Sequence, residues 1–321
     1  MSLSVLADKY CPMMLRPLLS RVQGSPIGKR LASGAFWSVL GNGLGKVLTF
    51  VAMIIVARML GKETFGDFGL VRSTAAPFLT FSTFAMGLAS TKYIAELLHN
   101  DKERVGRIIG LNYLLTFILS LVAALIFYFC VPYLCETMLG EARLVREMRY
   151  GALLLFLMTF MSAQVGIMSG FHDFKGQAYT IFIVGLLSIP IYFVGAKFGG
   201  LHGVVMALLA VTVANIFINS VFILRNVKRH GLRYSFRDAY KELPILWQFS
   251  LPIVCSNIIF CVGVWVGQVM LRMQSGGAGE LGIFFCAMTV FQCVMFLPGI
   301  LNSVTLPMLS ELQVDKNRKR F

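Results

Sequence analysis

Residues 34–57 read GAFWSVLGNGLGKVLTFVAMIIVA and lead directly into the polar turn RMLGKE at 58–63. An α-helix needs about 20 mostly apolar residues to cross about 30 Å of hydrocarbon, and this run is long enough to do so. Lys46 lies almost at its midpoint and is the only ionisable residue in the run. The segment therefore predicts a membrane-spanning helix that carries one cation inside the membrane.

Seven more apolar runs of similar length follow. The eight runs lie near 34–57, 67–91, 108–131, 150–170, 178–196, 201–224, 249–271 and 281–306. Hydrophobic residues make up 57% of the chain and charged residues 14%, unlike an ordinary soluble protein. The alternating pattern of transmembrane β-strands is absent. Because lipid offers the backbone no hydrogen-bond partners, we predict an all-α integral membrane protein, a polytopic helical bundle.

The net charge of +14 follows the predicted topology. If the N-terminus is cytoplasmic, 20 of the 29 Lys and Arg residues lie in cytoplasmic segments and 8 in outer segments. This excess is the positive-inside bias that orients membrane proteins. We therefore expect a cytoplasmic N-terminus and no nucleic-acid partner.

The chain offers no catalytic or metal-binding constellation. Its seven Cys and four His residues form no CxxC pair and no cluster with metal-ligand spacing. No loop carries clustered carboxylates, and no GxxxxGK[ST] phosphate loop occurs. We expect a protein that is not an enzyme and has no metal site and no cofactor.

An internal repeat organises the chain. When the sequence is shifted by 215 residues, segment 34–100 falls on 249–315 and Asn42 aligns with Asn257. Span lengths, the charged turn and the apolar blocks recur in the same order. The repeat begins again after six spans, so both copies share one orientation. This predicts two parallel bundles with a cavity between them.

The expected domains follow from this repeat. They are a basic cytoplasmic leader at 1–33, a six-helix lobe at 34–224, a basic cytoplasmic linker at 225–248 and the first two helices of a second lobe at 249–321. A complete second lobe would need four more spans. We therefore expect a C-terminally truncated chain or the N-terminal part of a longer transporter, with a natural eight-span protein as the alternative.

Two short motifs carry a resemblance to a known family. The first span ends in ARMLGKETFGDFGL at 57–70, and the second in GLASTKYIAE at 87–96. With the six-plus-six arrangement and the basic leader, these motifs resemble the polysaccharide-biosynthesis flippases of the multidrug/oligosaccharidyl-lipid/polysaccharide (MOP) exporter superfamily, including Wzx-type O-antigen flippases. The turn from Ala57 to Gly66, of the form AR-x-LG-x-x-x-FG, is the most specific part.

The resemblance implies a MATE-like, multi-pass protein of the bacterial inner membrane. It implies flipping of an undecaprenyl-pyrophosphate-linked oligosaccharide to the periplasmic leaflet by alternating access, for lipopolysaccharide O-antigen or other surface polysaccharide. The implied partners are the lipid-linked oligosaccharide, membrane lipids and polysaccharide polymerase or assembly proteins. A coupling ion, Na⁺ or H⁺, is left open.

Lys46 is the leading candidate for substrate binding. An ionisable group at mid-bilayer costs at least about 2.5 kcal/mol, so it should face protein or water. Helical spacing places Asn42, Lys46, Thr49 and Met53 on one stripe, beside a GxxxG at 41–45 that lets another helix approach. We expect Lys46 to attract the pyrophosphate of the lipid carrier. The alternative is a lysine that balances a backbone carbonyl or holds a helix pair.

Other polar residues within or at the ends of spans are weaker candidates for substrate binding. They are Asn215 and Asn219 in span six, Asn257 and Gln268 in span seven, and Lys92 at the inner end of span two. Asparagines serve interhelical hydrogen bonds as readily as sugar hydroxyls. The arginines at outer helix ends, Arg58, Arg72 and Arg272, are expected to be solvated or snorkelling anchors.

Three rival functions remain open at this point. A Na⁺- or H⁺-coupled multidrug exporter of the same superfamily would favour a buried carboxylate, and the sequence shows none near mid-span. A facilitator-superfamily carrier is suggested faintly by DKERVGR at 101–107. A membrane-embedded enzyme of polysaccharide synthesis should show a large outer loop or a His/carboxylate constellation, which the sequence lacks.

Overall fold

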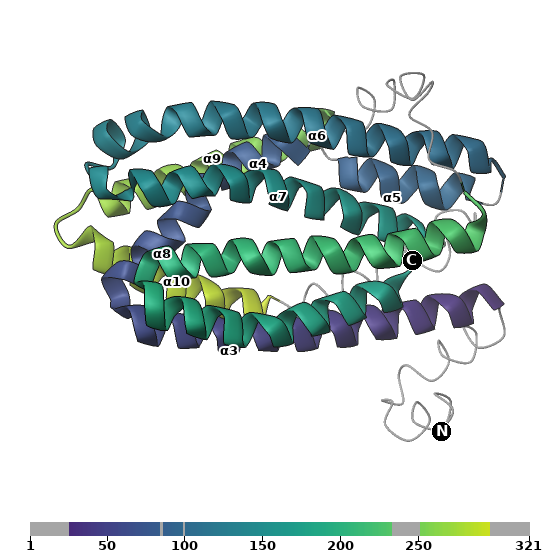
Figure 1. The fold of residues 1–321 in the computed structure, drawn as a ribbon, viewed down its shortest axis with the longest axis horizontal. Coiled ribbons are helices and arrows are strands. Elements are labelled where there is room, and N and C mark those ends of the chain that lie inside the picture. Colours follow the sequence, from purple (N-terminus) through teal and green to yellow (C-terminus); the bar gives the residue numbers. More distant parts are fainter. Residues whose placement is uncertain (1–25, 84–85, 99, 233–250, 296–321) are drawn as a thin grey trace, which may run out of the picture.

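The computed structural model describes residues 26–83, 86–98, 100–232 and 251–295 of the 321-residue chain. Helices and turns account for the secondary structure of this part of the chain (Figure 1). Four stretches are long and apolar enough to cross a membrane, with two shorter apolar helices at Asn257–Arg272 and Gly277–Gln292. The four stretches are Gly43–Leu97, Lys102–Met138, Ala142–Gly170 and Phe174–His230. The predicted all-α membrane bundle is confirmed.

The first two predicted spans are joined almost without a loop. Helix α3 (Pro26–Thr74) is interrupted at Gly61, where φ is 74° and ψ is 169°. Only glycine adopts such angles without strain, and the chain turns there into a second arm of the same helix. The turn expected over 58–63 is therefore shorter than predicted, because helix resumes directly after the glycine.

The second span is divided into pieces. After α3 come α4 (Ala76–Thr83) and α5 (Met86–Leu97). Pro77 lies at the start of α4, where its missing N–H costs nothing because the first amides of a helix have no intrahelical acceptor. The predicted continuous run at 67–91 is thus three helical segments.

The next helices begin at aspartate caps. Asp101 Oδ1 accepts a 2.9 Å hydrogen bond from the Arg104 amide and starts α6 (Lys102–Tyr133). A π-turn (Leu134–Met138) and a 3-10 turn (Ala142–Leu144) then lead into α7 (Val145–Gly170). Asp173 caps the following helix in the same way.

Helix α8 (Phe174–His230) contains the predicted fifth and sixth spans. Its 57 residues would extend about 85 Å if straight, far more than one crossing. The chain reverses at Gly200, where φ is 53°, and Figure 1 shows two antiparallel arms. A short turn through Gly276 then connects α9 (Leu251–Arg272) and α10 (Gly277–Val294).

Four reversals with positive-φ glycines gather at one end of the bundle, the left end in Figure 1. They contain Gly61, Gly140, Gly200 and Gly276. We call this end the glycine-turn end. The aspartate-capped reversals before α6 and α8 lie at the opposite end.

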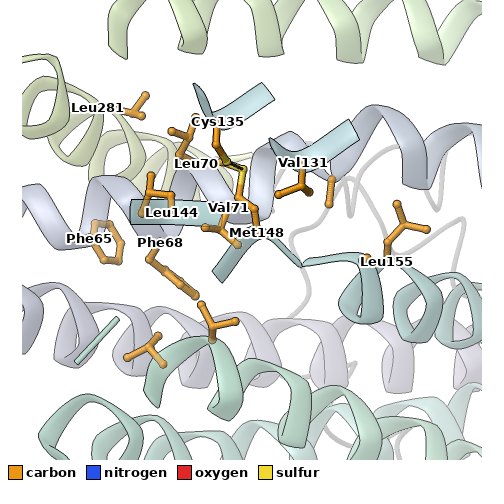
Figure 2. Packing of buried hydrophobic residues seen from close by; sticks show 14 of the residues in the cluster. Phe65, Phe68, Leu70, Val71, Val131, Cys135, Leu144, Met148, Leu155 and Leu281 are labelled. Carbon is orange, nitrogen blue, oxygen red and sulfur yellow. Dashed lines mark hydrogen bonds between the residues drawn. The ribbon is translucent and has the colours of Figure 1, made fainter. Parts of the chain in front are cut away.

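The larger hydrophobic core includes residues near the glycine turns, such as Phe65, Leu144 and Leu281, and Figure 2 shows part of its packing. Phe65 and Phe68 of α3 pack there with Met148 of α7 and with Leu281 of α10. A second core at the opposite end is built from α5, α6, α7 and α8. The predicted second lobe therefore shares a core with the first one near the glycine turns.

The predicted GxxxG packing is confirmed. Side chains added at Gly41 and Gly45 would collide with Ala178 and Ile181 of α8. The first arm of α3 and the first arm of α8 therefore lie in backbone-close contact, as small residues allow in membranes.

A glycine pair between α5 and α7 provides a test of this packing. A Cβ added at Gly166 would overlap the backbone of Gly87, whereas a Cβ added at Gly199 meets nothing within 4 Å. We expect Gly166→Ala to lose about 1–3 kcal/mol of stability through overpacking. Gly199→Ala is the matched control and should be neutral or slightly stabilising. Thermal midpoints in detergent measure both, and equal midpoints would contradict the close contact.

Candidate functional site

A cavity of about 190 Å³ lies where α3, α8 and α10 meet. Its lining residues are Gly45, Lys46, Thr49, Phe50, Ile181, Thr289 and Gln292. Among these seven, Lys46 is the only ionisable residue. The cavity therefore places a single cation among hydroxyl, amide and apolar groups at the junction of these three helices, where Lys46, Thr49 and Gln292 are exposed.

Lys46 links the first span to the eighth. Its Nζ donates a 3.3 Å hydrogen bond to the backbone carbonyl of Gln292 in α10. The side chain of Lys46 is exposed rather than buried among apolar groups. A lysine in this setting can present its charge to an anionic group that enters the cavity.

The other polar lining groups complement this cation. Thr289 Oγ1 donates at 2.8 Å to the Phe285 carbonyl within its own helix, and its oxygen can still accept hydrogen bonds. Thr49 and the Gln292 side chain add a hydroxyl and an amide. The space fits one anionic group with adjoining hydroxyls, and is smaller than the usual pocket for a whole drug-sized ligand.

The structure brings together part of the predicted stripe on the first span. Lys46 and Thr49 share the cavity, whereas Met53 is buried in the larger core. Asn42 lies on the same helix, but its side chain is outside the described residues.

The two candidates on the seventh span lie elsewhere. Asn257 is exposed on α9, and Gln268 is buried, with 6% of its surface exposed. Gln268 lines a second cavity of about 310 Å³ between α9 and α10, together with Gly263, Val264, Gly267, Leu271 and Phe284. Its Oε1 makes no hydrogen bond with the described residues.

The candidates on α8 and α5 do not line the Lys46 cavity. Asn219 Nδ2 donates at 2.9 Å to Asn215 Oδ1 on the same helix, and only 2% of Asn219 is exposed. The neighbouring Ser220 receives a 2.8 Å bond from Gln164 of α7. Lys92 is exposed in the middle of α5, with Nζ 5.0 Å from the centre of the Tyr93 ring.

Sequence reasoning missed Thr289 and Gln292 of the cavity. Both lie in the apolar run predicted at 281–306, three residues apart and therefore on one helix face. Polar residues inside a span were the available signal, but the distance of Gln292 from Lys46 in the sequence hid their contact.

The prediction that Arg272 is a solvated anchor is wrong. Its side chain is 5% exposed, and its Nη2 lies 2.6 Å from Glu141 Oε1 and 3.2 Å from Asp67 Oδ1. Asp67 itself is 1% exposed and pairs with Arg143 at 2.8 Å. The carboxylates draw Arg272 into the protein, whereas Arg58 and Arg72 of the same prediction are exposed.

Sequence reasoning also missed the burial of Asp67. This residue belongs to the motif at 57–70, which was assigned to the end of the first span and not to a buried contact. No described group of three or more His, Cys, Asp or Glu residues could hold a metal ion.

Comparisons with known proteins agree with this arrangement. Residues 31–313 match the family described as "Polysaccharide biosynthesis protein". The lipid III flippase of Escherichia coli (strain K12) is 23% identical over 301 residues, covering 90% of this chain and 70% of that protein. Stage V sporulation protein B of Bacillus subtilis (strain 168) is 23% identical over 294 residues, covering 83% of this chain and 55% of that protein.

Solved structures share the fold. An outward-facing multidrug resistance MATE family transporter of the MOP superfamily superposes with a TM-score of 0.66 at 17% identity, over 86% of this chain and 63% of that one. An inward-facing structure of such a transporter gives a TM-score of 0.63 at 18% identity, over 87% of this chain and 68% of that one. The MATE-like fold is confirmed, and the chain spans 63% of the length of the first transporter.

The water accessibility of the cavity can be tested by cysteine labelling. In a background without the seven natural cysteines, Thr49→Cys should react with a water-soluble maleimide, because thiolates form only where water reaches. Val47→Cys is the matched control, since Val47 lies on the same helix, is 59% exposed and does not line the cavity. We expect Thr49→Cys to react roughly tenfold faster. Equal rates would contradict a hydrated cavity.

Proposed function

Because the chain belongs to the polysaccharide biosynthesis protein family, we propose that it translocates a lipid-linked oligosaccharide across the membrane. The observation that carries this proposal is the single cation, Lys46, set among polar groups in a cavity between the first, fifth and eighth spans. The similarity to proteins named lipid III flippase and stage V sporulation protein B supports the same class of activity.

The site has the properties that transport of an anionic lipid requires. An ammonium group attracts a phosphate as a point charge, without the bidentate grip of an arginine, so that binding can be reversed. The hydroxyl and amide groups of Thr49, Thr289 and Gln292 suit sugar or phosphate oxygens. The Lys46–Gln292 bond joins α3 to α10, so a ligand that competes for Lys46 would act directly on the contact between the two predicted lobes.

The finer assignment is what the family resemblance implies, and it is part of the same proposal. The substrate is an undecaprenyl-pyrophosphate-linked oligosaccharide for surface polysaccharide such as O-antigen, and the membrane is the bacterial inner membrane. A cytoplasmic N-terminus puts the glycine-turn end on the periplasmic side. In this setting polymerase or assembly proteins would receive the flipped product, and six-helix lobes would alternate access around the cavity.

Removing the charge tests the proposal. Lys46→Ala should abolish surface glycan in a complemented flippase-deficient strain, because the pyrophosphate loses its countercharge. Lys46→Arg should retain at least part of the transport, since the charge remains. Membrane abundance is matched by immunoblotting. Arg58→Ala is the control, because Arg58 is an exposed cation just beyond the same span.

Full glycan export by Lys46→Ala would refute the assignment of this cavity. Failure of the unaltered chain to complement any flippase-deficient strain, together with export of cationic drugs, would favour the multidrug exporter instead.

A further inference from the structure

Polar contacts between α9 and the α3–α4 segment form a line that starts at the glycine-turn end. Trp265 Nε1 donates at 3.3 Å to Thr74 Oγ1. One helical turn deeper, Cys261 Sγ lies 3.3 Å from Thr80 Oγ1. The α9 members are four residues apart and so share one helix face. We call this line of contacts the seam.

Four charged side chains lie at the glycine-turn end, where the seam starts. Arg272 Nη2 lies 2.6 Å from Glu141 and 3.2 Å from Asp67, and Arg143 Nη2 lies 2.8 Å from Asp67. Arg143 also bonds Glu141 at 2.7 Å. Two acids and two bases cancel in formal charge. Arg272 alone comes from the predicted second lobe, so its ion pairs cross between the lobes.

Because these ion pairs are buried, the loss of one partner has a large effect on stability. The side chains of Asp67 and Arg272 are 1% and 5% exposed, so each depends on the other and on its neighbours for compensation of its charge. Removing one partner of a buried pair is strongly destabilising for the arrangement that buries it. Surface pairs, by contrast, contribute little.

The pairing is nevertheless incomplete. Asp67 Oδ1 and Arg272 Nε make no hydrogen bond with the described residues. Opening this end would let water hydrate both groups, which offsets part of the lost attraction. The arrangement therefore favours closure while leaving separation accessible.

Backbone contact beside the charges shows how tightly this end is closed. A Cβ at Gly66 of α3 would overlap Ala278 and would lie 2.9 Å from the Gly282 amide of α10. A Cβ at Gly69 would overlap the Phe285 ring. Little room remains between the two lobes at the level of Asp67.

We propose that Asp67, Glu141, Arg143 and Arg272 form an ionic latch that holds the glycine-turn end of the seam closed. The seam opens from this end when the latch breaks, and the cavity between the lobes then becomes accessible from that side. The latch concerns the two lobes themselves and does not depend on the identity of the transported molecule.

A cysteine placed behind the latch reports its opening. Thr74 is fully buried under the charges, so Thr74→Cys in a cysteine-free background should react slowly with a water-soluble maleimide in nanodiscs. Arg272→Gln and Asp67→Asn should each raise this rate on the order of tenfold, because an uncompensated buried charge favours the open arrangement. Arg272→Lys should give an intermediate rate.

Arg72→Gln is the matched control, since Arg72 is an exposed arginine on the same arm of α3 and is in none of these ion pairs. Thr74→Cys should be labelled at the same rate in the Arg72→Gln protein as in the protein with all four latch residues unchanged. Unchanged rates in both Arg272→Gln and Asp67→Asn would overturn the proposal, and so would an equal rise in Arg72→Gln.

A second readout does not rely on labelling. Thr80→Cys, with Cys261 as the only natural cysteine kept, should form a disulfide on mild oxidation, because the two side chains touch in the closed seam. Arg272→Gln should lower the cross-linked fraction, and Arg72→Gln should not. Equal cross-linking in all three proteins would overturn the latch. Neither readout requires transport, so a failure of the latch is distinguishable from a failure of the proposed function.

Discussion

The contact between α3 and α10 at Gly66 and Gly282 determines what the rest of the structure can do. Since neither residue has a side chain, the two backbones touch, and α10 is seated directly on the second arm of α3. This contact also fixes the position of the turn between α9 and α10. Arg272, the last residue of α9, therefore lies within reach of Asp67. Further along the same pair of helices, the Gln292 carbonyl meets Lys46.

Arg272 and Lys46 have opposite environments. Arg272 is buried, and its charge is paired with the carboxylates of Glu141 and Asp67 across the boundary between the two predicted lobes. Lys46 donates to the Gln292 carbonyl and lines a cavity, where the proposed role of its charge is to attract an anionic ligand. A basic residue near hydrocarbon raises the free energy of the folded protein. Ion pairs offset this increase for Arg272, and the polar groups around the cavity offset it for Lys46. The proposed site and the proposed latch are therefore separate along the bundle axis.

The amides illustrate a limit of reasoning from single helices. Asn215 and Asn219 lie on one helix face, as their spacing predicts, and they bond each other within α8. Gln268 lines a cavity, and its side-chain oxygen Oε1 makes no hydrogen bond with the described residues. All three residues were candidates because they are polar residues within spans, and the sequence of one helix does not specify the neighbour on the other side. Their roles in binding stay predictions.

The sequence by itself determined the membrane class, the helical architecture and the approximate spans, because hydrocarbon thickness and backbone hydrogen bonding act locally on runs of apolar residues. It also determined the GxxxG contact, since small residues at a four-residue spacing leave a groove wherever a helix forms. Only the tertiary structure decided that Arg272 is buried, that Asp67 faces it and that Thr289 and Gln292 complete the Lys46 cavity. These partners lie some 200 or more positions apart in the chain. Charge pairing depends on distances of a few ångströms, which no local pattern encodes.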